Sequence, residues 1–179
     1  MSRTLSLQNR QRVRRVDTAL LRRITRHLLR DQFRVVDFEL AIHLVAADEM
    51  SRVNWSFLQH EGSTDVITFD HSNEPASLMK PKSSLHGEIF ICIDDALKQA
   101  REFRTTWQSE LTRYVIHGLL HLLGHDDLKP AARRRMKLEE NRLLRRTAGT
   151  FPLVELDRDT RKPRRVPSPK SERTSRSTA

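Results

Sequence analysis

Residues 107–123 carry the longest strong helix signal in the sequence, and this segment limits the possible folds more than any other. Leu111, Val115, Leu119 and Leu122 repeat at intervals of three and four residues, which places one apolar stripe along a helix. Gly124 follows the last apolar residues and is expected to end the helix. The rest of the chain should pack around this central helix.

The other periodic segments are shorter and mix helix and strand patterns. Helical spacing predicts helices at 16–29, 52–58, 96–103 and 131–144, and apolar or alternating runs predict strands at 38–44, 66–69 and 89–93. The run at 89–93 is apolar on both faces, which is typical of a central strand. Residues 71–85 are rich in Ser, Pro and Lys and predict a loop. This order predicts an α+β fold, a single domain with a small mixed β-sheet packed with about five helices.

Four residues, three aspartates and one proline, mark the expected starts of helices. Asp48 is expected to cap the helix at 52–58, and Asp94 with Asp95 should lie at the positive end of the helix at 96–103. Pro130 suits the first position of the helix at 131–144. These signals support the helix boundaries without relying on apolar spacing alone.

The charge of the chain points to a polyanionic partner. Among 179 residues the formal net charge is +10, which favours nucleic acid, with an anionic membrane surface as the weaker alternative. Residues 158–179 hold eight basic and two acidic residues, a net charge of +6, in a Pro-, Ser- and Arg-rich composition that cannot build a core. We therefore predict a folded domain at 1–157 and a basic, disordered tail at 158–179.

The single cysteine and the absence of long apolar runs limit the class of protein further. Cys92 lies in the apolar run 89–93 and is interpreted as a small core residue, so neither an internal disulfide nor a Cys-based zinc site is expected. The basic N-terminus lacks the apolar stretch of a signal peptide, and no segment reaches membrane-spanning length. A cytoplasmic protein that does not enter membranes is the expectation.

The chemistry of the chain is concentrated at the end of the central helix. His117 and His121 are four residues apart, so their rings should project from one face about 6 Å apart along the axis. Beyond the turn at Gly124, Asp126 or Asp127 can add a carboxylate to the same ion. Two histidines and one carboxylate leave a coordination position open for water, as in catalytic metal sites.

A zinc metalloprotease is the first competitor for such a histidine pair. Those enzymes use His-Glu-x-x-His, in which the glutamate is the general base. Gly118 follows His117 here, so the base is missing from its required place. Peptide hydrolysis is therefore a weak hypothesis.

Four blocks of sequence, in order along the chain, resemble the YbeY family of ribosomal RNA maturation factors. The most specific is His-Gly-Leu-Leu-His-Leu-Leu-Gly-His-Asp at 117–126, and the others are Gln-Asn-Arg-Gln at 8–11, Asn54 with Thr-Asp-Val-Ile-Thr-Phe at 64–69, and His-Gly-Glu-Ile-Phe-Ile at 86–91. The likeness spans residues 5–144. It implies a single-strand-specific endoribonuclease with one bound metal, usually zinc, that acts in 16S ribosomal RNA 3′ end maturation and ribosome quality control.

The resemblance also implies a set of metal ligands, with two departures from the common pattern. The ligands implied are His117, His121 and the residue ten after the first, Asp127, where the family commonly has histidine. A carboxylate ligand suits zinc but also Mn or Mg. At Leu58 the family commonly has an arginine that is thought to help with RNA.

Several further residues have candidate roles. His125 is a possible catalytic residue as a proton shuttle, and either His125 or Asp126 can orient a ligand ring. Thr64 and Asp65 are expected to fix a loop, with substrate contact second, and His86 is interpreted as a surface residue. A basic helix face carries Arg22, Arg23, Arg26 and Arg30, which is most simply a solvated surface.

Two other functions compete with the nuclease. One is a non-catalytic ribosome-assembly or RNA-binding factor with a structural metal, whose partners would include ribosomal RNA and small-subunit ribosomal proteins. The other is a metallohydrolase of small molecules or peptides, which predicts no salt-sensitive RNA binding.

Overall fold

The structure is a computed structural model, and it describes residues 2–72 and 84–160. Its strands are β1 (Arg3–Asn9), β2 (Asp37–Val45), β3 (Val66–Asp70) and β4 (Ser84–Cys92). Its α-helices are α1 (Thr18–His27), α2 (Ala47–Leu58), α3 (Ile93–Glu102), α4 (Trp107–Leu122) and α5 (Pro130–Thr150), and its shorter turns are η1 (Leu28–Gln32), η2 (Leu153–Leu156) and η3 (Arg158–Thr160). The predicted α+β class, with a small mixed sheet and five α-helices in the described residues, is confirmed.

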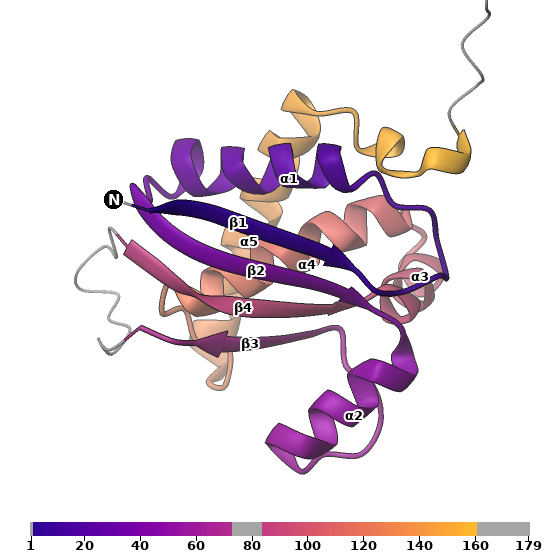
Figure 1. The fold of residues 1–179 in the computed structure, drawn as a ribbon. Coiled ribbons are helices and arrows are strands. Elements are labelled where there is room, and N and C mark those ends of the chain that lie inside the picture. Colours follow the sequence, from indigo (N-terminus) through magenta and orange to yellow (C-terminus); the bar gives the residue numbers. More distant parts are fainter. Residues whose placement is uncertain (1, 73–83, 161–179) are drawn as a thin grey trace, which may run out of the picture.

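The four strands form one mixed sheet in the order β1-β2-β4-β3 (Figure 1). β1 pairs with β2 and β2 with β4 in parallel, whereas β3 runs antiparallel to β4. Residues 89–92 of the predicted apolar run belong to β4, which has a neighbour on both sides, as its two apolar faces predicted, whereas Ile93 begins α3. The strand itself begins earlier than predicted, at Ser84, and ends at Cys92.

Strand β1 is absent from the sequence-based prediction. Its burial is slight, since Leu5 is its one buried residue and Leu7 is half-buried. It lies at the edge of the sheet, where a single neighbour, β2, supplies its backbone hydrogen bonds. The apolar pattern of such an edge strand is too sparse to identify it.

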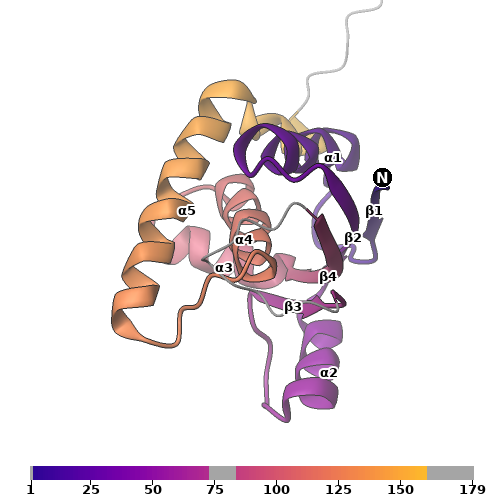
Figure 2. The ribbon, with the colours of Figure 1, turned by 90° about the vertical axis from the view of Figure 1, so that its left-hand side faces the viewer.

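The helices cover one face of the sheet in layers (Figure 2). Helix α4 lies directly against the sheet, α5 lies outside α4, and α2 projects beside β3. Residues on almost all sides of α4 are buried, including Leu111, Val115, Ile116 and Leu120. This confirms that the histidine-bearing helix is the central one.

Gly118 lets α4 approach the sheet closely. A Cβ atom at this position would lie 2.8 Å from the Cγ2 atom of Ile89, shorter than real Cβ contacts. The glycine that follows His117 therefore has a packing role on β4. This close packing of Gly118 on Ile89 sets the distance between the sheet and the part of α4 that carries His117 and His121.

Helix starts differ in detail from the prediction. Helix α2 begins at Ala47, whose backbone N–H donates to Asp94 Oδ2 across 2.8 Å, so Asp48 lies inside the first turn instead of capping the helix. Helix α1 begins after Asp17, whose Oδ1 accepts the Leu20 N–H at 2.9 Å. Asp94 and Asp95 do lie in the first turn of α3, as predicted.

The predicted tail begins inside the packed structure. Arg158 donates its backbone N–H to the Arg15 carbonyl at 2.9 Å, and Asp157 pairs with Val16. Residues 158–160 thus form a short 3-10 turn against the start of α1, and the rest of the predicted tail, 161–179, lies outside the described residues. Most of the predicted loop at 71–85, namely residues 73–83, also lies outside the described residues.

In the described parts of the chain, no helix has the length and apolarity needed to cross a membrane.

Candidate metal centre

Three side-chain atoms that could bind a metal ion lie close together near the C-terminal end of α4. The Nε2 atoms of His117 and His121 are 3.0 Å apart, and their rings are nearly perpendicular, at 84°. Asp127 Oδ2 lies 3.9 Å from His121 Nε2. One ligand atom from each of these three half-buried residues lies within 4.8 Å of the others, a spacing at which they can hold one metal ion.

The loop after α4 turns back because Gly124 adopts a left-handed conformation, with φ of +93°. The backbone N–H of His125 then donates to the Leu120 carbonyl at 2.9 Å. Arg133, at the start of α5, donates from Nε to the carbonyl of Asp127 at 2.9 Å. The turn predicted at Gly124 thus exists, and it carries Asp127 back to the histidine pair.

Each histidine has a hydrogen-bond acceptor on its Nδ1 atom. His117 Nδ1 lies 2.6 Å from the Glu140 carboxylate on α5, and His121 Nδ1 lies 3.2 Å from the His125 carbonyl. Because a carboxylate or carbonyl oxygen accepts, Nδ1 carries the hydrogen in both rings. In their neutral forms, both Nε2 atoms therefore present a lone pair toward the same point.

The lone pairs provide a test of whether the group suits a metal ion. Two lone pairs 3.0 Å apart repel each other unless a cation lies between or beside them, either a proton on one Nε2 atom or a metal ion. The Asp127 carboxylate adds negative charge at the same point. Two nitrogens and one carboxylate oxygen, with both rings fixed in the ligating tautomer, are a donor set that fits a divalent ion.

The surroundings shift the two histidines in opposite directions. Burial alone would lower the pKa of His117, but the hydrogen bond and charge of Glu140 outweigh burial, and the pKa lies above its ordinary value. Burial, followed by the charge on His117, lowers the pKa of His121. The negative charge of Glu140 therefore acts mainly on the His117 side of the pair.

Glu140 is a functional candidate that the sequence reasoning missed. It is buried, and Arg113 Nη1 lies 3.7 Å from its second oxygen. Arg113 is itself held by Glu110 and by Asn141. Glu140 lies 23 residues after His117, so no local motif connects them. The signal that identifies it is a charged residue within the buried stripe of α5, which consists of Met136, Glu140, Leu143 and Thr147.

His125 and Asp126, the other two candidates near the histidine pair, make different contacts in the structure. His125 contributes its backbone carbonyl to His121, and burial lowers the pKa of its half-buried side chain. Asp126 Oδ1 accepts the Leu128 N–H at 2.9 Å and so stabilises the loop. Of these two residues, His125 contacts the His121 ring, through its backbone carbonyl, and Asp126 contacts the loop backbone.

Thr64 and Asp65 fix a loop as expected. The Thr64 hydroxyl and the Val66 N–H both donate to Asp65 Oδ1, at 3.1 and 2.9 Å. His86 is exposed, as interpreted, and its ring lies 5.5 Å from that of His71. Leu58 ends α2, and 48% of its surface is exposed. It does not line the cavity that residues of α3, α4 and α5 form beside His117.

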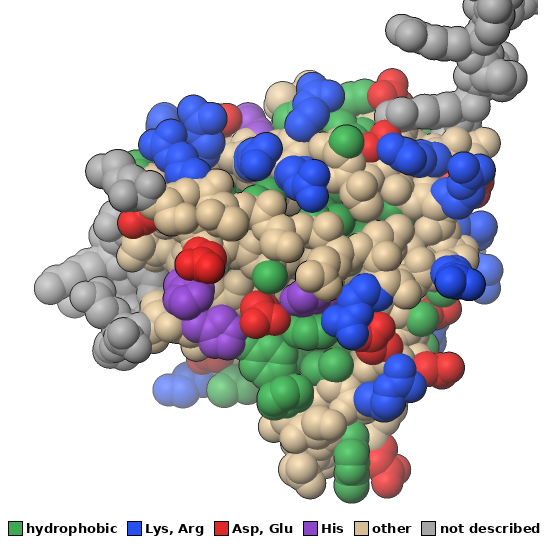
Figure 3. Space-filling model, in the orientation of Figure 1, with side chains coloured by type: hydrophobic (Ala, Val, Ile, Leu, Met, Phe, Trp, Pro, Cys, Tyr) green, Lys and Arg blue, Asp and Glu red, His purple; other side chains and the backbone are tan. Residues whose placement is uncertain are grey.

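The open face of the sheet and the α1 edge differ in the side chains they present (Figure 3). Histidine, acidic and hydrophobic side chains gather near the middle and lower part of this face, and basic side chains lie along its upper edge, over α1. On α1, Arg23 and Arg26 are exposed and Arg22 is half-buried. The predicted basic helix face is therefore largely exposed to solvent, and Arg30, in η1, is exposed as well.

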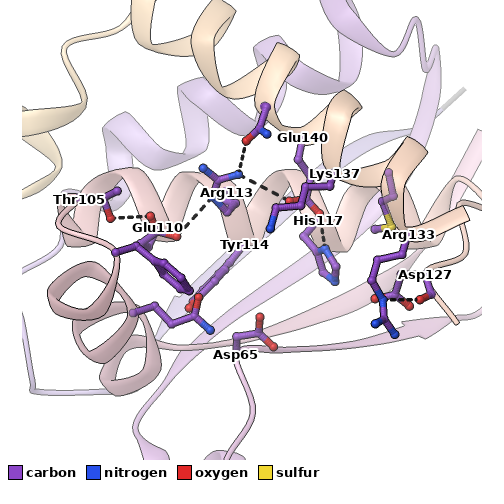
Figure 4. Close-up of a pocket in the computed structure, with 14 residues that line it drawn as sticks. Asp65, Thr105, Glu110, Arg113, Tyr114, His117, Asp127, Arg133, Lys137 and Glu140 are labelled. Atoms are coloured by element: carbon purple, nitrogen blue, oxygen red, sulfur yellow. Dashed lines mark hydrogen bonds and ion pairs between the residues drawn. The ribbon is translucent and has the colours of Figure 1, made fainter. Parts of the chain in front are cut away.

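His117 and Asp127 also line a cavity of about 420 Å³ (Figure 4). Its walls come from α3, α4 and α5 and from the segment before β3. Arg133, Lys137 and Glu140 line it from α5, and Tyr114 lines it from α4. The candidate metal group thus adjoins a concave site large enough for a small ligand.

Comparisons with known proteins agree with this geometry. A family model described as endoribonuclease YbeY matches residues 6–148. A protein of that name from Salinibacter ruber is 35% identical over 147 residues, covering 78% of this chain and 89% of the relative. Another from Chlorobium luteolum is 34% identical over 140 residues, covering 78% and 95%.

A solved structure shares the fold. The solution structure of TM1509 from Thermotoga maritima matches with a TM-score of 0.59 and 25% sequence identity, covering 83% of this chain and 92% of that one. The family match, its extent and the resemblance of the four sequence blocks agree. This chain belongs to the endoribonuclease YbeY family.

Proposed function

We propose that this protein is a single-strand-specific, metal-dependent endoribonuclease that acts in 16S ribosomal RNA 3′ end maturation and in ribosome quality control. Family membership supports the reaction class. The observation that carries the proposal is the convergence of His117, His121 and Asp127 beside a cavity. A net charge of +10 suits an RNA substrate.

In this proposal His117, His121 and Asp127 hold one divalent ion. Such an ion would supply a bound water of lowered pKa and a Lewis acid for a phosphoryl oxygen. Glu140 keeps the His117 Nδ1 protonated and its Nε2 free to ligate. The His125 carbonyl does the same for His121, and Arg133 holds the backbone of Asp127.

We propose zinc as the ion, with Mn or Mg as alternatives because of the carboxylate of Asp127. Imidazole suits zinc, and carboxylate oxygen suits the harder ions as well. Because the set leaves a coordination position for water, it is suited to catalysis. His125 remains a candidate proton shuttle, since its lowered pKa keeps it neutral near pH 7.

The partners follow from the same proposal. Ribosomal RNA or other single-stranded RNA is the substrate, small-subunit ribosomal proteins are further partners, and the cytoplasm is the place of action. A second candidate function, a non-catalytic assembly factor with a structural metal, is favoured by one observation. Leu58 supplies no positive charge where the family resemblance implies arginine.

The test is metal content by mass spectrometry, combined with cleavage of a single-stranded RNA and a duplex of the same sequence. The full chain should hold about one ion and cut the single strand. His121→Ala and Asp127→Ala should lose most of the ion and the cleavage, whereas His125→Ala, which keeps the backbone carbonyl, should retain the ion.

Three other results would contradict the nuclease proposal or its set of metal ligands. Tight RNA binding without cleavage under zinc, manganese or magnesium would replace the nuclease with the assembly factor. Retention of metal by Asp127→Ala would remove Asp127 from the ligand set. Wild-type protein without any metal would contradict both metal-based functions.

A further inference from the structure

We infer that the cavity beside the metal group is a nucleotide-binding subsite, in which Tyr114 and Asp65 contact a base and Lys137 and Arg133 contact a phosphate. This inference rests on the proposed function and names the part of the RNA that the site holds. The cavity of about 420 Å³ lies within the size range of small-ligand sites and adjoins two of the three ligand residues.

Tyr114 carries an unused hydrogen-bonding group in the wall of the cavity. Its side chain is 2% exposed, and its hydroxyl has no hydrogen-bond partner among the described residues. Burial, followed by the charge of Asp65, raises its pKa far above the ordinary value, so the group is a neutral phenol able to donate. A buried hydroxyl without a partner is unfavourable, and a ligand atom that accepts from it removes this cost.

Asp65 provides an acceptor next to this donor. Figure 4 shows Tyr114 extending from α4 toward Asp65. Asp65 Oδ1 is occupied by Thr64 and Val66, whereas no described residue donates to Oδ2. The edge of an unpaired base presents an N–H donor beside an acceptor, which a carboxylate and a hydroxyl complement. Phe103, 60% exposed, lines the same cavity and offers a ring for stacking.

Two cations on α5 face the cavity near Asp127. Arg133 and Lys137 are four residues apart, hence on one side of the helix. Within the described residues Lys137 has no ion-pair partner, and Arg133 uses only its Nε atom, on the Asp127 carbonyl. Arg113, by contrast, is held by Glu110, Glu140 and Asn141. Lys137 and Arg133 are therefore the cations available to a phosphate.

The experiment is a titration of the full chain, followed by NMR, with cytidine 5′-monophosphate and with ribose 5-phosphate, which lacks a base. Wild type should bind the nucleotide more tightly than the sugar phosphate. Tyr114→Phe should weaken nucleotide binding about three- to tenfold and leave sugar phosphate binding unchanged. Lys137→Ala should weaken both and reduce the salt dependence of binding.

Matched variants separate these effects from general damage. Arg134→Ala removes the same charge from the exposed surface of α5 outside the cavity and should bind both ligands as wild type does. Asp65→Asn keeps an oxygen for Thr64 and Val66 and provides a second test of base contact, since it should also weaken nucleotide binding. Equal nucleotide affinities for wild type, Tyr114→Phe and Asp65→Asn would overturn the base contact.

The phosphate contact and the proposed function fail in distinguishable ways. Equal affinities for Lys137→Ala and Arg134→Ala would overturn the phosphate contact. If the predicted binding pattern holds but no RNA is cut, the endoribonuclease proposal fails and the subsite stands. If RNA is cut but the variants bind nucleotide as wild type does, the subsite is wrong and the endoribonuclease proposal stands.

Discussion

The His117 imidazole donates from Nδ1 to the Glu140 carboxylate across 2.6 Å, joining the central helix to the helix that covers it. Glu140 on α5 also lies beside Arg113, so its carboxylate links two residues of α4, His117 and Arg113. Such an outer carboxylate fixes the tautomer of a ligand histidine and raises its basicity.

Replacing Glu140 with glutamine should weaken metal binding while the fold persists. The amide keeps an oxygen that accepts from His117 but loses the negative charge, so we expect metal affinity to fall about tenfold, within the range seen for such outer partners. Competition with a chelator measures this affinity. Glu139→Gln is the matched control on the same helix, because Glu139 pairs with Arg142 and makes no hydrogen bond or ion pair with His117 or His121 within the described residues. Equal losses in both variants would rule out a specific role for Glu140.

Replacing Asp127 with histidine should change which metal the site prefers. Three nitrogen ligands favour zinc, whereas the carboxylate is a ligand that Mn and Mg also accept. We expect the ratio of zinc to manganese affinity, measured by competition between the two ions, to rise in Asp127→His. An unchanged ratio would show that Asp127 does not contact the ion.

Gly118→Ala should destabilise the protein because α4 has no room for a methyl group. The added Cβ would lie 2.8 Å from Ile89, and overpacking of this kind costs about 1–3 kcal/mol in the free energy of unfolding. Gly149→Ala, in α5, meets nothing within 4 Å and should instead stabilise the helix by about 0.5–1 kcal/mol. Urea denaturation of both variants measures the difference, and a change of the same sign in both would contradict this packing argument.

Cys92 should resist alkylation until the protein unfolds. The thiol is fully buried, and burial raises its pKa to about 12. The thiolate is the reactive form, so at pH 8 almost none is present in the native state. Iodoacetamide labelling followed by mass spectrometry should show slow modification in buffer and rapid modification in denaturant. Rapid labelling of the native protein would mean that β4 opens locally.

Deleting residues 161–179 should weaken RNA binding and flatten its salt dependence. The deleted segment holds seven basic residues and one acidic residue, a net charge of +6. Metal content should stay the same, because the ligand residues are not in this segment. Binding of a single-stranded RNA at several salt concentrations gives the slope, and identical slopes for the two forms would disprove a role for the tail.

The metal group could be predicted because it is local in sequence. His117 and His121 are one helical turn apart, and Gly124 ends the helix so that Asp127 follows within a few residues. Each step depends on neighbours along the chain, which periodicity and turn chemistry describe well. The choice of Asp127 over Asp126 came from the family resemblance. In the structure Asp127 Oδ2 lies 3.9 Å from His121 Nε2, whereas Asp126 Oδ1 accepts the Leu128 N–H.

Contacts across the fold could not be predicted in the same way. Glu140 meets His117 only because α5 packs on α4, and the sequence does not state that packing. The cavity likewise needs Asp65, from the segment before β3, to lie beside Tyr114 on α4. Strand β1 is an edge strand with too few apolar residues for its pattern to stand out.

Residues 153–158 pack against α1 and the segment before it, and this contact shows how much of the chain the folded core requires. The match to the family model ends at residue 148, yet Leu153 and Leu156 are buried in the same core as Val16 and Leu20. Asp157 and Arg158 then pair with residues 15–17. A chain cut at residue 148 would expose the flank of α1 to water, so the segment that must fold together extends beyond the residues that match the family model.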